Sequence, residues 1–213
     1  MDNNKMIKYS KEFNNKNVIK HHKESSKKIN LRNVYIVLSQ TNTYPARAIR
    51  FYTHEPYAHA SISFDDDLKE MYSFARKGIY NPFNAGFIRE NIDEGIFGRF
   101  TSTTCCVYKL QITNSQYYKL REVIDEFKRN KDAYAYNYLG LIGAAFNIPV
   151  KLKQRYFCSQ FVAYVLYKSD INIFDKEYVL VKPKDIRVNP FMESIYHGRL
   201  SEYRTYKRKY KLA

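Results

Sequence analysis

The chain has 213 residues, 45% of them apolar, which is enough for one globular domain with its own hydrophobic core. The formal net charge is +15, but residues 1–32 hold nine Lys and Arg against three acidic residues, and residues 199–213 hold six against one. These two ends contribute +6 and +5, so the middle carries only +4. A nucleic-acid-binding core is therefore not favoured, although the basic ends could contact an anionic surface.

The composition also argues against metals, cofactors and disulfides. Three cysteines, two of them adjacent at Cys105 and Cys106, form neither a disulfide framework nor a zinc-ligand spacing. The three aspartates at residues 65–67 are too closely spaced for a calcium loop and lack its later Glu. No apolar leader or membrane-spanning run is evident in the sequence. We therefore expect a cytoplasmic, soluble protein with no metal and no cofactor.

The first predicted elements build a sheet. Residues 34–38 form a continuous apolar run that is typical of a central strand, and Pro45 opens a predicted short helix that extends to about residue 53. Residues 58–64 predict a strand that places His59 and two serines on one face and apolar side chains on the other. One imidazole is thus held on rigid structure.

A third strand is predicted over residues 70–76, antiparallel to the histidine strand across the acidic turn, and this pairing would bring Ser73 near His59. Residues 79–103 are rich in turn formers and aromatic residues, and they predict a long loop that shapes a binding site.

The second half of the chain predicts strands and helices in alternation. They are a strand over 104–112, a helix from the N-cap Ser115 to about Arg129, a short buried helix over 139–146, a helix over 156–169, a short helical piece after 182–185, an edge strand near 192–196 and a turn at His197. The predicted organisation is a basic polar extension over 1–32, one domain over 33–200 and a basic tail over 201–213.

One cysteine and one histidine stand out as a candidate catalytic pair. Cys158 lies in the first turn of a predicted helix, where free backbone N–H groups and the helix dipole favour the reactive thiolate. Cys105 and Cys106 lie within a strand, where a cysteine usually acts as a small buried apolar residue. His59 is the one histidine that the patterns place on a strand face. Thiol catalysis needs such a base, so the sequence predicts the pair Cys158 and His59.

Four segments of the chain together resemble a known family. They are residues 34–39, the pattern Tyr57-x-His59-x-Ser61-Ile62, residues 71–74 and the pattern Phe157-Cys158-Ser159-x-Phe161-Val162-Ala163. In this order they resemble the circularly permuted NlpC/P60 cysteine hydrolases, a group that includes the YiiX/YaeF-like proteins and is related to lecithin:retinol acyltransferase-like enzymes. Ordinary NlpC/P60 domains have the cysteine first, whereas here the histidine precedes it.

The resemblance implies a papain-like α+β fold, with the nucleophile helix packed against an antiparallel sheet. It implies that the Cys158 thiolate attacks an amide or ester carbonyl, with His59 as base and then acid, to give an acyl-enzyme. The oxyanion would be met by the Cys158 N–H and by Tyr57. The position that matches the third catalytic residue is Ser73, and Glu70 is the charged alternative.

Three functions follow from these observations. The first is an amidase or peptidase that acts on murein-type peptides or small amides. The second is an acyltransferase or thioesterase that acts on lipid acyl groups. The third is a non-catalytic, basic, tyrosine-rich module that binds nucleic acid. The expected ligand is a small peptide, amide or acyl substrate, with no specific nucleic acid; the sequence makes no prediction of oligomeric state.

Overall fold

The computed structural model describes residues 30–41, 55–78, 81 and 84–210. The predicted helix over residues 45–53 and nearly all of the predicted N-terminal extension lie outside the described residues.

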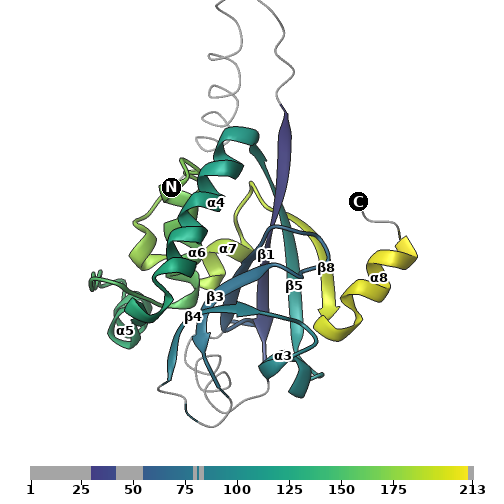
Figure 1. Cartoon of the computed structure of the whole chain (residues 1–213), viewed down its shortest axis with the longest axis horizontal. Helices are drawn as coiled ribbons and strands as arrows, with labels where there is room; N and C mark the ends of the chain where they lie inside the picture. The colour runs from purple at the N-terminus through teal and green to yellow at the C-terminus, as the bar shows by residue number, and fades with distance from the viewer. Residues whose placement is uncertain (1–29, 42–54, 79–80, 82–83, 211–213) are drawn as a thin grey trace, which may run out of the picture.

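A six-stranded antiparallel sheet forms the centre of the molecule, with the strand order β4-β3-β2-β1-β5-β8 (Figure 1). Its strands are β1 (Leu31–Gln40), β2 (His59–Ser63), β3 (Met71–Arg76), β4 (Ala85–Glu90), β5 (Thr104–Thr113) and β8 (Glu193–Arg199). The predicted antiparallel α+β class is confirmed. From Val34 to Gln40 every side chain of β1 is buried, because both faces of the sheet are covered.

Helices cover the two faces of the sheet. Helices α4 (Asn114–Arg129) and α6 (Cys158–Lys168) lie on one face, and α3 (Gly95–Arg99) and α8 (Tyr203–Tyr210) lie on the other (Figure 1). Shorter elements complete the described chain: η1 (Lys131–Ala133), β6 (Ala135–Tyr136), α5 (Tyr138–Ala145), β7 (Arg155–Tyr156), η2 (Tyr178–Leu180), α7 (Pro183–Arg187) and η3 (Leu200–Glu202). No helix of this described part is long and apolar enough to cross a membrane.

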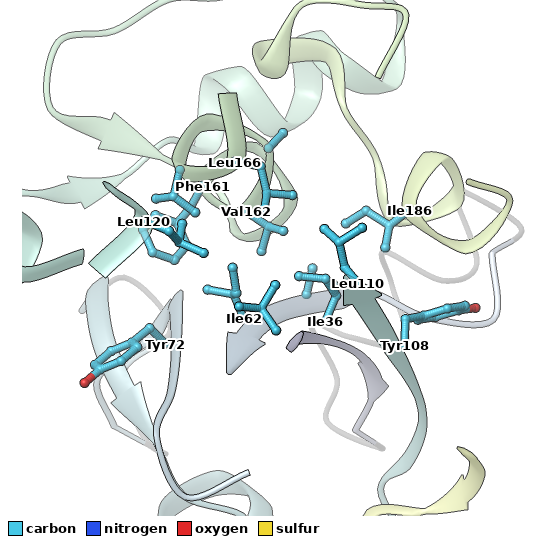
Figure 2. Close-up of a cluster of buried hydrophobic side chains, with 14 of the residues drawn as sticks. Ile36, Ile62, Tyr72, Tyr108, Leu110, Leu120, Phe161, Val162, Leu166 and Ile186 are labelled. Carbon is cyan, nitrogen blue, oxygen red and sulfur yellow. The ribbon is translucent and has the colours of Figure 1, made fainter. Parts of the chain in front are cut away.

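The larger core lies between α6 and the sheet. Phe161, Val162 and Leu166 of α6 are fully buried and point toward Ile36 and Ile62 on the strands (Figure 2). Each such side chain stabilises the fold by about 1.5–3 kcal/mol relative to an exposed one. This packing holds the first residue of α6, Cys158, in a fixed place against the sheet.

The structure differs from the sequence prediction within residues 79–103. In place of one long loop it contains β4 and α3, separated by a turn. Packing of Phe87 favours the strand β4. Its ring stacks on that of Tyr72 of β3, with ring centroids 5.8 Å apart, and its centroid lies 5.7 Å from that of Phe161. The glycines and asparagines around this segment hide that tertiary contact from a local sequence pattern.

The C-terminal end also differs from the prediction. His197 lies within β8 instead of a turn, and the segment predicted as a basic tail contains α8. Tyr203 anchors this helix, since it is almost completely buried and packs edge-on against Tyr196 of β8 with ring centroids 5.1 Å apart. Helix α4 is capped by Thr113, two residues before the predicted Ser115.

Candidate active site

Cys158 is the first residue of α6, and a buried hydrogen-bond network fixes this helix start. The side-chain oxygen of Gln160 accepts hydrogen bonds from the Phe157 N–H at 3.2 Å and from the Asn137 amide at 3.3 Å. The oxygen of Asn137 accepts from the Gly140 N–H at 2.8 Å and so caps α5. One asparagine therefore ties the start of α5 to the start of the cysteine helix.

The thiol of Cys158 lies against the open edge of β2. Its sulfur is 3.9 Å from the carbonyl oxygen of Ala58, and the Ala60 N–H also donates to it. This edge is open because β2 pairs with β3 only at Ile62 and Ser63, so the two strands diverge beside His59. The divergence makes room for the thiol next to the histidine that begins the strand.

The imidazole of His59 is held by a carboxylate from another strand. Its Nε2 lies 2.9 Å from Oε1 of Glu90, the last residue of β4. The Ser61 hydroxyl donates to Oε2 of Glu90 at 2.5 Å and lies 3.2 Å from the imidazole Nε2. The imidazole of His59 also forms a hydrogen bond with the side chain of Cys158. The imidazole of His59 therefore lies between the thiol of Cys158 and the carboxylate of Glu90.

Electrostatics favour an ion pair between the thiol and the imidazole. Burial lowers the pKa of His59, but the charge of Glu90 and hydrogen bonds to Cys158 and Glu90 outweigh it and raise the pKa from 6.5 to about 10. Burial likewise raises the pKa of the Cys158 thiol, but the hydrogen bond and charge of His59, with the N–H groups of Ala60 and Ser159, lower it overall. Both shifts favour the pair in which the thiol has lost its proton and the imidazole carries one.

Tyr136 adds a hydroxyl to the same site. The short parallel pair β6 and β7 sets Tyr136 opposite Tyr156, two residues before the cysteine. The Tyr136 hydroxyl interacts with both the side chain and the backbone N–H of Cys158. Burial and the negative charge of Cys158 raise the pKa of Tyr136 well above its usual value, so it stays protonated and can donate a hydrogen bond to an oxyanion.

The other three predicted site residues make contacts of a different kind. Ser73 is buried, and its hydroxyl has no hydrogen-bond partner in the structure. Glu70 binds Arg121 at 2.6 Å, so its charge is used between α4 and the sheet. The ring of Tyr57 is buried and meets the ring of His197 of β8 edge-on, with ring centroids 6.4 Å apart. The side chain that contacts the imidazole of His59 is Glu90, and the hydroxyl that interacts with Cys158 is that of Tyr136.

The remaining cysteines behave as predicted. Cys105 and Cys106 are buried, unpaired by disulfides and on opposite faces of β5. Burial, followed by the charge of Cys106, raises the pKa of the Cys105 thiol far above its ordinary value. Cys105 is therefore an unreactive internal reference for Cys158. Within the described ranges, no cluster of three or more His, Cys, Asp or Glu side chains could hold a metal ion.

A small cavity opens beside the carboxylate. Its volume is about 220 Å³, and its lining includes Glu90, Phe97 and the cationic side chains of Arg76, Lys77 and Arg89. Phe97 also faces the imidazole of His59, with ring centroids 6.4 Å apart. The cavity is smaller than the roughly 300–1,000 Å³ of sites for drug-sized ligands. It offers space for a small chemical group next to Glu90, the carboxylate that contacts His59.

Comparison with protein-family models, with curated proteins and with solved structures gave no match for this chain.

Proposed function

We propose that this chain is a cysteine hydrolase of the permuted NlpC/P60 type, with a papain-like arrangement, that cleaves an amide bond through an acyl-enzyme. The observation that carries the proposal is the series Cys158, His59 and Glu90, in which a helix start, a strand start and a strand end supply a thiol, an imidazole and a carboxylate. Such a series is the arrangement that activates a nucleophile.

In the proposed reaction the Cys158 thiolate attacks the carbonyl carbon, a C–S bond forms and the carbonyl electron pair moves to oxygen. The N–H of Cys158 and the hydroxyl of Tyr136 donate to this oxyanion. His59 gives its proton to the leaving nitrogen as the C–N bond breaks. The neutral imidazole then takes a proton from water, the resulting hydroxide attacks the thioester and the C–S bond breaks. The thiolate and the imidazolium are regenerated.

The small cavity beside Glu90 favours a small amide or a murein-type peptide fragment as the substrate. Its lining carries three cationic side chains and two carboxylates, those of Glu90 and Glu94, and this net positive charge suits a substrate that carries a carboxylate, as a peptide end does. A second candidate is transfer or hydrolysis of a lipid acyl group, which the exposed apolar side chains of α5 favour, since α5 begins two residues after Tyr136.

Thiol labelling tests the catalytic pair. With an alkyne-tagged iodoacetamide at neutral pH, we expect Cys158 to react well before Cys105 and Cys106. His59→Ala should slow the labelling of Cys158, whereas the matched change His197→Ala should leave it within about twofold. Equal, slow labelling of all three thiols would exclude an activated nucleophile.

Substrate incubation separates the two candidate reactions. The protein is incubated with amino-acid amides, murein peptides and short-chain acyl esters, and the mass of Cys158 peptides is measured. An adduct from amides or peptides supports the amidase, and an adduct from acyl esters alone supports acyl transfer. If Cys158 labels rapidly and no substrate leaves an adduct or a hydrolysed product, the hydrolase proposal is refuted.

A further inference from the structure

The helix α5 and the chain that follows it display apolar side chains to solvent. Leu139 and Ile142 of α5 are 62% and 58% exposed, and Ile148 is 58% exposed. Phe146 and Leu152 are also exposed. The sequence predicts a short buried helix here; the helix is confirmed, but it buries only Gly140, Gly143 and Ala144. We call these five side chains the apolar lobe; Figure 1 shows α5 at the periphery of the fold.

Hydrogen bonds and a close glycine contact hold the backbone of the apolar lobe in place. The Ile148 N–H donates to the Gly143 carbonyl at 2.8 Å, and a Cβ on Gly143 would lie 2.6 Å from the Ile148 carbonyl oxygen, so only glycine permits this contact. Asn147 makes the reversal with a φ of 58°, and the Asn137 amide donates to the Val150 carbonyl at 3.4 Å. The chain is thus folded back on α5 while its apolar side chains remain outside.

Charge indicates what covers this surface. No Asp or Glu occurs between Asp132 and Asp170, whereas Lys151 and Lys153 flank Leu152 and Arg155 follows shortly after. All three are exposed, and Lys151 pairs with Glu177 at 2.8 Å. A further cation, Lys182, reaches Asn147 at 3.0 Å. An apolar tip with a cationic border matches an anionic lipid surface, where apolar groups enter the bilayer and cations meet the headgroups.

We propose that the apolar lobe docks on an anionic lipid bilayer. Docking would also orient the candidate site toward the bilayer, because Tyr136 lies next to the lobe. The ring centroids of Tyr136 and Tyr138 are 4.7 Å apart. Docking itself is independent of catalysis. Its consequence, that the substrate is an amphiphile taken from that bilayer, rests on the proposed hydrolase function.

A tryptophan placed on the lobe reports docking directly, because the chain has no tryptophan of its own. Ile142→Trp is compared with Val188→Trp, whose native side chain is 59% exposed but lies between α7 and β8. With phosphatidylcholine vesicles that contain phosphatidylglycerol, we expect a blue shift and quenching by brominated lipid for Ile142→Trp only. No shift for Ile142→Trp, or an equal shift for both variants, overturns the proposal.

Sedimentation with the same vesicles measures the contribution of the lobe to affinity. Replacing Leu139 and Ile142 together by Ser should weaken binding by about tenfold or more, because two apolar side chains leave the bilayer. The matched pair, Val188→Ser with Phe191→Ser, should change binding by less than about twofold. Unchanged binding of the first pair would assign vesicle affinity to the basic ends of the chain and refute docking through the lobe.

Two further measurements separate docking on a bilayer from its alternatives. Cys158→Ala should bind vesicles as the wild type does, so docking can succeed even where the hydrolase proposal fails. A blue shift of Ile142→Trp that grows with protein concentration in the absence of vesicles would show that a second copy of the chain covers the lobe. That outcome also overturns the proposal.

Discussion

Replacing Glu90 with Gln tests the thiol, imidazole and carboxylate series most directly. The substitution keeps the shape of the side chain and removes its charge 2.9 Å from the imidazole Nε2 of His59. A hydrogen bond between charged groups contributes about 1.5–3 kcal/mol, against about 1 kcal/mol for a neutral one. Because His59 is only 19% exposed, solvent replaces little of this loss.

The expected effect is slower thiol chemistry. Without the carboxylate charge the imidazolium is less stable, so less of Cys158 is present as thiolate at neutral pH. The alkylation rate of Cys158 should fall roughly tenfold to a hundredfold, since about 1.4 kcal/mol is a factor of ten. The assay is pseudo-first-order labelling followed by mass spectrometry, with Cys105 as the internal reference.

Ser73→Ala is the matched control, because the Ser73 hydroxyl has no hydrogen-bond partner in the structure. It should leave the labelling rate within about twofold, in line with changes that remove no interaction. If Glu90→Gln labels at the wild-type rate, or if Ser73→Ala is slowed as much, the placement of Glu90 as the partner of His59 is refuted.

Three more predictions concern the oxyanion, the pH dependence and the core. Tyr136→Phe should slow acyl-enzyme formation from an activated ester by about tenfold to a hundredfold, because one oxyanion donor is lost. The alkylation rate of Cys158 should change far less. An equal loss in both assays would contradict the role of Tyr136 as an oxyanion donor. The pKa of His59 is raised from 6.5 to about 10, so its stabilisation is fully present below pH 6.5 and is lost as the pH rises through 10. The difference in Tm between the wild type and Glu90→Gln should therefore shrink over that range, and a difference that grows would reverse the assigned sign. Phe161→Ala should lower the free energy of unfolding, measured in urea, by about 3–5 kcal/mol because its ring is fully buried. Tyr167→Ala, at an exposed position of the same helix, should lower it by less than about 1 kcal/mol. Similar losses for both variants would contradict the packing of α6.

Local pattern was sufficient for much of the sheet and for the cysteine helix. The alternation over residues 58–64 placed His59, Ser61 and Ser63 on one face, and the structure has this arrangement. The apolar spacing in α6 likewise placed Phe161 and Val162 against the sheet. These features depend on how often apolar residues recur in a helix or a strand, and this spacing can be read directly from the sequence.

Tertiary contacts decided the features that local pattern missed. The strand β4 forms because Phe87 stacks on Tyr72 across two strands, and the glycine beside it weakens any local strand signal. Since β4 ends at Glu90, missing this strand also meant missing the carboxylate that holds His59. The exposed face of α5 has a related cause, because small residues in a short apolar segment are equally consistent with a buried helix.

The sequence by itself determined an α+β chain with a basic end at each terminus, and it singled out Cys158 and His59 by their positions on a helix and a strand. Only the tertiary structure decided which side chains complete the candidate site. Glu90 lies 31 residues after His59 in the sequence, and Tyr136 lies 22 residues before Cys158. Their approach depends on strand register and on the divergence of β2 from β3. Register is set by packing over the whole sheet, so no local period encodes it.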